Sequence, residues 1–490
     1  MIVGLEREII DQSAYDRNVE RVQAAGVTLP KIADLADPAN NLADRAAILA
    51  EVDPDTPAGG NLFRVHWHND ASRRQLVDVP EHIVLDTVLT GVEAKIIVAV
   101  GDRFPMVRAH KVLAAYGCLV PRLLSGIFDV SHHRAVWPST GNYCRGGVAI
   151  SRILGCRSVA VLPEGMSRER FQWLENWTTD PTDILRTPGT ESNVKEIYDA
   201  CHELSKDPGN IILNQFAEFG NYIIHRAVTG PAFERMFRAV KGTGDLKARA
   251  FVSATGSAGT IAAGDYLKDA LGAQVCAVEA TECPTLLYNG YGEHNIQGIG
   301  DKHVPFIHNV MNTDFVIGVS DQASDSLNLL FNTTVGRNYL SERVGMDQQS
   351  IAALGDLGLS SIANIVGAIK YAKYMDLKSD DAVLTVATDG AQMYQPDLTE
   401  VEKRLCAGGF DALKAAEIYG HHMLGAATDH MIELDRAGHE RIFNLGYYTW
   451  VEQQGVDLSD FDARRDQAWW DGLMDLVPVW DGMIDKFNSA

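Results

Sequence analysis

Three segments of the chain carry residue types and spacings that suit the chemistry of amines and anions. Lys111 follows the extended, proline-containing stretch "DRFPMVRAH" and starts a helix-like run. A lysine at such a junction is either a surface charge or a desolvated amine able to form a Schiff base with a carbonyl cofactor. A Ser-Thr-Gly-Asn turn ends at Asn142, and a glycine-rich loop follows an apolar stretch that ends near Ser253. Each segment offers polar groups where a strand or loop meets a helix.

The glycine-rich loop "GSAGT" is typical of a phosphate site. It leaves backbone N–H groups free at the start of a helix, where the helix dipole favours an anion. Two hydroxyl groups add donors, and the candidate binding residues are Gly256, Ser257, Ala258, Gly259 and Thr260. The loop lacks the G-K-[ST] of a Walker A loop and the G-x-G-x-x-G of a dinucleotide fingerprint, which argues against a nicotinamide dehydrogenase. On this loop alone, a tight turn without a ligand is equally compatible.

The elements that must hold these segments are short apolar strands alternating with helices. Strands are predicted at 93–100, 158–162, 249–253, 274–280 and 382–387, with amphipathic helical patterns between them. This alternation is the pattern of parallel α/β sheets covered on both faces.

Changes in composition divide the chain into three regions. We expect an N-terminal extension of helices and loops at 1–79, a catalytic core at 80–399 and a helical C-terminal extension at 400–490. After about Pro396 no further strands are predicted. The C-terminal region holds four tryptophans and many Met and Leu residues, so it should pack onto the core or onto a second subunit.

Composition excludes several classes of partner. The net charge is −22 and no basic block occurs, so nucleic acid is a poor partner. No apolar run approaches the ~18 residues of a membrane helix, and the N-terminus lacks an export signal, so we expect no membrane and a cytoplasmic location. The seven scattered cysteines fit a reducing compartment. None of the histidine pairs has the spacing of a zinc site, and no metal is expected.

Taken in chain order, the motifs resemble the fold-type II pyridoxal phosphate enzymes, and within them the cysteine synthase and cystathionine β-synthase family. "STGNY" is similar to the family's T-S-G-N-T loop, "VLPEGMSRERFQWL" to M-P-E-x-M-S-x-E-R-R-x-x-L, and "GSAGT" to G-T-G-G-T. "HNIQGIG", "GLSSIA" and "VATDG" resemble H-K-I-Q-G-I-G, G-I-S-S-G-A and I-L-P-D-S. The similarity extends over roughly 80–397 and includes the segment that begins at Gln215.

The resemblance implies a fold and a set of roles. The fold would be tryptophan synthase β-like, with two three-layer αβα subdomains, the smaller at about 120–230, and pyridoxal 5'-phosphate between them. Lys111 would hold the cofactor and remove the substrate α-proton. Asn142 would bind the phenolic oxygen, and either Ser360 or Ser361 would face the pyridine nitrogen. The residues that would meet the substrate are Ser139, Thr140, Gly141, Tyr143, Arg145 and Gln215.

Departures from the family pattern bear on the substrate. The residues around the lysine differ, and the loop's second threonine is replaced by Tyr143, followed by Cys144 and Arg145. Arg145 either binds a second anionic group of the substrate or points to solvent. We therefore expect a lyase that performs β-elimination on a β-substituted amino acid, an acidic one if Arg145 binds it, through an aminoacrylate.

Two alternatives stay open at this point. One is a β-replacement synthase of the cysteine synthase or cystathionine β-synthase type. The other is a catalytically silent interaction module, suggested by the changed lysine flank and the extensions. By the same resemblance, a homodimer in amino-acid metabolism is expected.

Overall fold

The computed structural model describes residues 4–139, 141–189, 193–300 and 302–490, and its framework is two β-sheets. The larger, seven-stranded sheet has the order β1-β2-β10-β7-β8-β9-β11, and the four-stranded sheet has the order β5-β4-β3-β6. The larger sheet consists of β1 (His82–Val84), β2 (Lys95–Val100), β7 (Lys247–Ala254), β8 (Gln274–Ala280), β9 (Phe315–Val319), β10 (Asp381–Ala387) and β11 (Met431–Glu433). The smaller sheet consists of β3 (Arg134–Pro138), β4 (Arg157–Pro163), β5 (Ile184–Thr187) and β6 (Asn210–Ile212).

The central strands of the larger sheet are parallel and buried on both faces. β2, β10, β7, β8 and β9 pair in parallel, whereas β1 and β11 add antiparallel edges. Successive side chains of a strand point to opposite faces, so Ile96 and Val98 join one apolar core and Ile97 and Ala99 the other. Helices α14 (Asp321–Asn332) and α17 (Leu359–Tyr374) pack in the first core, and α11 (Gly230–Lys241) and α12 (Ala262–Leu271) in the second.

The smaller sheet is wholly parallel and also lies between helices. α7 (Asn142–Ile153) packs on one face, where it also meets α6 (Lys111–Ser125), and α9 (Val194–Leu204) covers the other face. α8 (Arg168–Trp177) packs beside α7. The predicted fold class, two αβα subdomains with helical extensions, is confirmed, and the smaller sheet falls within the range expected for the smaller subdomain.

Helices extend the chain at both ends. The N-terminal ones are α1 (Gln12–Ala24), α2 (Ile32–Ala36), α3 (Pro38–Asn41) and α4 (Ala46–Glu51). The C-terminal ones are α18 (Leu398–Leu405), α19 (Ala412–Ile418), α20 (Arg436–Tyr447), α21 (Leu458–Ala463), α22 (Gln467–Gly472) and α23 (Leu476–Ser489). The remaining helices are α5 (Thr87–Thr90), α10 (Phe219–Ile224), α13 (Thr285–Tyr288), α15 (Thr334–Tyr339) and α16 (Gln348–Ala353).

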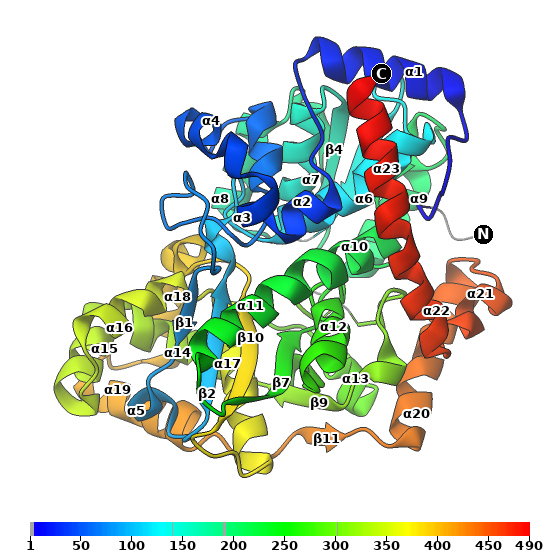
Figure 1. Ribbon diagram of the computed structural model, residues 1–490. Coiled ribbons are helices and arrows are strands. Elements are labelled where there is room, and N and C mark those ends of the chain that lie inside the picture. The colour runs from blue at the N-terminus through cyan, green and yellow to red at the C-terminus, as the bar shows by residue number, and fades with distance from the viewer. Residues whose placement is uncertain (1–3, 140, 190–192, 301) are drawn as a thin grey trace.

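The C-terminal region differs from expectation in one element and agrees in its packing. The expectation that strands stop after Pro396 is wrong, because β11 pairs with β9 there. α23 runs beside α1, α2 and α6, so the last helix lies against the smaller subdomain and the N-terminal extension (Figure 1). The C-terminal region therefore packs onto its own chain, which is one of the two arrangements expected from the sequence.

No single helix in the described ranges is long and apolar enough to cross a membrane. One sharply bent pair, 348–356 with 359–374, passes on length and composition alone. The second member of that pair is α17, which is buried against β10 inside the larger subdomain.

Candidate active site

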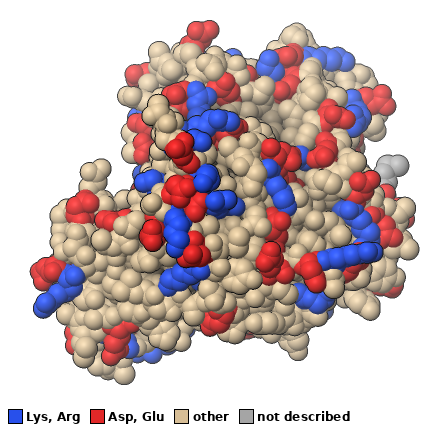
Figure 2. All heavy atoms as spheres, turned by 60° about the horizontal axis from the view of Figure 1, so that its bottom comes forward, with Lys and Arg blue, Asp and Glu red and all other residues tan. Residues whose placement is uncertain are grey.

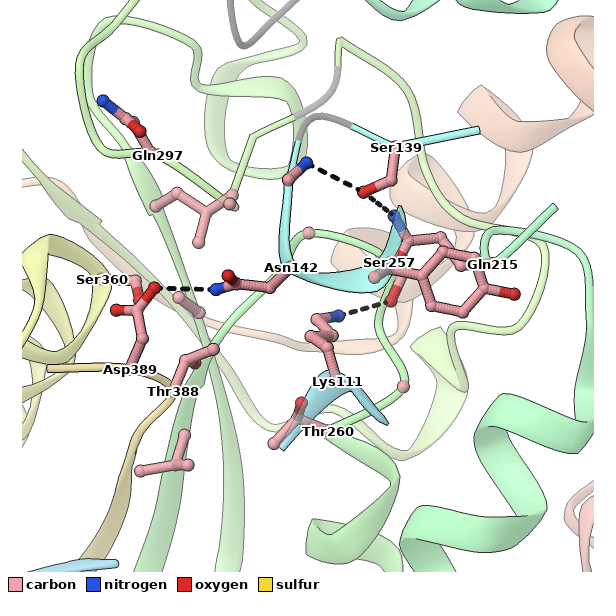
Figure 3. Close-up of a pocket in the computed structure, with 18 of the residues that line it drawn as sticks. Lys111, Ser139, Asn142, Gln215, Ser257, Thr260, Gln297, Ser360, Thr388 and Asp389 are labelled. Atoms are coloured by element: carbon pink, nitrogen blue, oxygen red, sulfur yellow. Dashed lines mark hydrogen bonds between the residues drawn. The ribbon is translucent and has the colours of Figure 1, made fainter. Parts of the chain in front are cut away.

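A cavity lies where the carboxyl ends of parallel strands from both sheets meet. Its walls are formed by the turn after β3, the loop after β7, the residues after β10 and the first residue of α6. Ligand sites of open α/β sheets form at this end of the strands because the connecting loops leave backbone groups unpaired there. The three segments singled out from the sequence thus come together (Figure 3).

Lys111 lies at the cavity wall as the first residue of α6. Its Nζ donates to Ser257 Oγ at 3.0 Å, so the amine points at the glycine-rich loop (Figure 3). The preceding residue, His110, is fully buried, and its Nε2 lies 2.7 Å from Thr260 Oγ1. Burial lowers the pKa of His110 to about 3, and the neighbouring Lys111 charge contributes, so the imidazole is neutral.

The glycine-rich loop forms a close-fitting cradle. Added side-chain atoms would clash at Gly256 with the Gly298 carbonyl and at Gly259 with the Asn221 side chain. Ala258 adopts φ +61°, in the left-handed region where the family motif has glycine. The loop lies at the start of the helical run that continues into α12, so its shape and donors fit a phosphate.

The Asn-bearing turn faces this cradle across the cavity. Ser139 Oγ accepts from Gly141 N and from Gln215 Nε2, both at 3.2 Å. Asn142 opens α7, and its Nδ2 donates to Asp389 Oδ2 at 2.7 Å. Thr140, also predicted to meet the substrate, lies outside the described residues.

Tyr143 reaches the cavity, but its hydroxyl is already engaged. The Tyr143 OH donates to the Leu213 carbonyl at 3.1 Å, and the ring packs edge-on against Trp137. The residue thus borders the cavity with its apolar ring edge rather than with a free hydroxyl.

The first turn of α17 separates the two candidate serines. Ser360 lines the cavity, whereas Ser361 does not, and its Oγ is buried without a hydrogen-bond partner in the described chain. Of the two serines, Ser360 is therefore the one that a ligand in the cavity can reach.

Arg145 does not lie where a substrate anion would meet it. Its guanidinium is buried, donates to Asn142 Oδ1 at 3.2 Å and lies 4.9 Å from the Trp173 ring centroid. It is absent from the described lining of the cavity. Both expectations for Arg145, direct anion binding and exposure to solvent, are wrong, because α7 turns the side chain back along its own axis to Asn142.

Sequence reasoning missed a different arginine that does line the cavity. Arg170 of α8 is 2% exposed, and its Nη1 donates to Gln297 Oε1. Its Nε would lie 2.9 Å from a side-chain atom added at Gly141, so only glycine there allows the approach. The similarity of "SRERFQ" to the E-R-R of the family motif was the sequence signal that could have identified Arg170.

Asp389, directly after β10, is the second residue whose role was missed. It is buried, and burial raises the pKa of its carboxyl although Asn142 donates to it. Tyr394 OH donates to the same carboxylate at 3.0 Å. Gln297, Thr388 and Asp389 are further polar residues that line the cavity.

Comparison with known proteins supplies the context for this geometry. Residues 102–327 match the family described as "Pyridoxal-phosphate dependent enzyme". "Cysteine synthase B" of Campylobacter jejuni is 30% identical over 255 residues, which cover 51% of this chain and 74% of that protein. "Cysteine synthase" of Staphylococcus aureus strain N315 is 29% identical over 261 residues, covering 53% and 74%.

Solved structures share the fold. A hydrogen sulfide-producing enzyme from Fusobacterium nucleatum superposes with a TM-score of 0.53 at 22% identity, covering 64% of this chain and 96% of that one. A cysteine synthase from Entamoeba histolytica gives 0.55 at 18% identity, covering 70% and 93%. Each match covers nearly all of the solved chain and leaves about a third of this chain outside it.

Proposed function

Because the chain belongs to the cysteine synthase family of fold-type II pyridoxal phosphate-dependent enzymes, we propose that it performs β-elimination on a β-substituted amino acid carrying a second anion. The observation that supports the second anion is Arg170. Its Nε is buried at the cavity wall without a hydrogen-bond partner among the described residues. A guanidinium with an unused donor suits a carboxylate, sulfonate or phosphate.

The described residues divide the work between cofactor and substrate. Lys111 would hold pyridoxal phosphate, and its amine would take the α-proton of the substrate. The loop 256–260 would bind the phosphate and Ser360 the pyridine nitrogen. The bound cofactor accepts the electrons left when the α-proton departs, so the protein contributes position and electrostatics.

The two anions of the substrate would meet different donors. The turn at Ser139 and Gly141 would take the α-carboxylate through its hydroxyl and N–H groups, as the family resemblance implies. Arg170 lies beside this turn and would take the second anion. Burial and the charge of Arg170 lower the pKa of Arg145 to about 10, so an added anion would also relieve repulsion between the two guanidinium groups.

Replacement of the leaving group by a second substrate is the alternative, favoured by the relatives named cysteine synthase. The test offers O-acetylserine, serine, cysteine, cysteate and β-hydroxyaspartate, and measures keto-acid release with and without sulfide. Fast elimination from an acidic substrate supports the proposal. Cysteine formation from O-acetylserine, with no elimination from any acidic substrate, would establish the synthase instead.

A variant pair isolates Arg170. Arg170→Met should raise KM for the acidic substrate about 10- to 100-fold, the loss of a charged hydrogen bond, and change KM for O-acetylserine much less. Arg168→Met, on the exposed side of the same helix, is the control. An equal loss for both substrates would mean that Arg170 binds the α-carboxylate common to them.

We further propose a cytoplasmic homodimer without nucleic acid as a partner. All seven cysteines are buried free thiols, which suits a reducing compartment. Lysine and arginine are interspersed with acidic side chains on the face in Figure 2, rather than gathered in a basic patch.

Val84, Val88 and Leu424 are large exposed apolar residues available to a subunit contact. Light scattering tests the dimer, and a monomeric mass would refute it.

A further inference from the structure

Arg145 of α7 forms a short relay with Asn142 and Asp389. Arg145 Nη1 donates to Asn142 Oδ1 at 3.2 Å, and Asn142 Nδ2 donates to Asp389 Oδ2 at 2.7 Å. All three residues are at most partly exposed, and Arg145 and Asp389 are buried. The second contact is drawn in Figure 3.

The hydrogen-bonding groups of Arg145 and Asp389 permit only one orientation of the Asn142 amide. A guanidinium can only donate hydrogen bonds, and a carboxylate can only accept them. Arg145 therefore selects the oxygen of the Asn142 amide, and Asp389 selects its nitrogen. Reversing the amide would set Nδ2 against a donor and Oδ1 against an acceptor, so both contacts would become repulsive.

Both ends of the relay are themselves fixed. Arg145 is held by the Trp173 ring at 4.9 Å, and its Nη1 lies 3.8 Å from Met393 Sδ. The Asp389 carboxylate accepts from Tyr394 OH at 3.0 Å. The relay also joins α7 of the smaller subdomain to the end of β10 in the larger one.

We propose that Arg145 and Asp389 are positioning residues that hold the Asn142 amide with its NH2 group toward the cavity. An amide nitrogen has two hydrogens, so Nδ2 can donate to Asp389 and still offer one to the phenolic oxygen of the cofactor. The proposal rests on the cofactor binding that family membership brings, and it does not depend on which amino acid is the substrate.

The first test is the visible spectrum of the holoenzyme. Arg145→Met should shift the pH at which the cofactor absorption band changes and weaken cofactor binding about tenfold, since the donor to the phenolic oxygen is no longer oriented. Arg145→Lys, which can still donate to Asn142 Oδ1, should recover much of the wild-type spectrum. Arg152, on the same helix, donates to the Trp177 carbonyl, and Arg152→Met should leave the spectrum unchanged.

A double-mutant cycle decides whether the effect passes through Asn142. In an Asn142→Ala background, Arg145→Met should cause no further change in the spectrum or in cofactor affinity. Additive losses, or a wild-type spectrum for Arg145→Met alone, would overturn the proposal. If Arg145→Met does not fold, Asp389→Leu, which removes the acceptor of Asn142 Nδ2, tests the other end of the relay in the same cycle by the same criteria. A wild-type protein that binds no cofactor would contradict the function, whereas a coloured protein with additive losses contradicts only the relay.

Discussion

At the scale of single residues, the assignment of the amine is the most direct point to test. Lys111→Ala should abolish covalently bound, borohydride-reducible cofactor and leave the fold intact, because the side chain lies at the cavity wall, where its amine donates to Ser257 Oγ. Mass spectrometry after reduction measures the adduct. Lys370→Ala is an informative comparison, because that amine is buried elsewhere and donates to the Gly318 carbonyl. An adduct that persists in Lys111→Ala would show that another lysine holds the cofactor.

Ala258 carries backbone strain that can be removed. Its φ of +61° lies in a region that costs a non-glycine residue about 1–2 kcal/mol. Glycine offsets part of this gain through its larger unfolded-state entropy, about 0.5–1 kcal/mol. Ala258→Gly should therefore stabilise the protein by about 0.5 kcal/mol, seen as a small rise in Tm. Ala368→Gly, inside α17, is the control and should lower Tm.

Glu279 should make stability depend on pH. Burial raises the pKa of its carboxyl to about 7, although Leu286 N and Leu287 N donate to it. The folded-state value exceeds the unfolded one, so the folded protein binds more protons and this group's contribution to stability falls as pH rises from about 4.5 to 7. Denaturation of Glu279→Gln at several pH values should show a weaker decline over that window. An unchanged profile would mean that the carboxyl is ionised throughout.

At the scale of elements, the N-terminal extension supports the cofactor site. Trp67 stacks on His110 with ring centroids 5.3 Å apart, and its Nε1 donates to Thr229 Oγ1 at 2.9 Å. His110 in turn contacts Thr260 of the glycine-rich loop. The tryptophan thus packs behind the residue next to the lysine and supports the cavity wall from outside.

Substitutions at Trp67 should separate packing from hydrogen bonding. Trp67→Ala should cost about 3–5 kcal/mol of stability and loosen cofactor binding, because it leaves a cavity beneath His110. Trp67→Phe should keep most of the packing and lose about 1 kcal/mol with the hydrogen bond to Thr229. Thermal unfolding and cofactor titration measure the two effects, with the exposed Ile48→Ala as control. Wild-type cofactor affinity in Trp67→Ala would contradict the supporting role.

The elements that sequence could predict differ physically from those it could not. Strands such as β2 and β10 are continuous apolar runs buried on both faces, so their pattern is visible locally. β11 has only three residues, and it is a strand because β9 offers an unpaired edge far away in sequence. Arg145 and Arg170 show the same limit. The sequence shows that both residues are arginines, but it does not show where their side chains point. Those directions depend on Asn142 and Gln297, to which the two guanidinium groups donate in the folded chain.

At the scale of the whole molecule, the two chain ends stabilise each other. Trp480 of α23 is buried and its Nε1 donates to the Glu6 carbonyl at 2.9 Å. Asn488 exchanges hydrogen bonds with both backbone groups of Leu29, at 2.8 and 3.0 Å. Asp481 accepts from Ile32 N at 2.6 Å, so it satisfies a donor at the start of α2. These contacts tie the last helix to the extension that carries Trp67.

Removal of α23 should therefore affect a site that it does not touch. A chain ending at Asp475 loses the burial of Leu476, Trp480, Ile484 and Phe487, each worth about 1.5–3 kcal/mol. It also exposes the apolar surface of α1, α2 and α6 beneath them. We expect a marked fall in Tm, followed by weaker cofactor binding as the N-terminal extension loosens around Trp67.

Two variants keep this expectation testable if the shortened chain aggregates. Trp480→Ala should lower stability by about 3–5 kcal/mol through the cavity it creates. Asp485→Asn, at an exposed position of the same helix, should change little. Cofactor affinity is measured by titration below the unfolding temperature of each variant. If Trp480→Ala destabilises the protein but leaves affinity unchanged, the two chain ends are coupled in stability alone. If affinity falls with stability, the packing of the last helix reaches the cofactor site through the N-terminal extension.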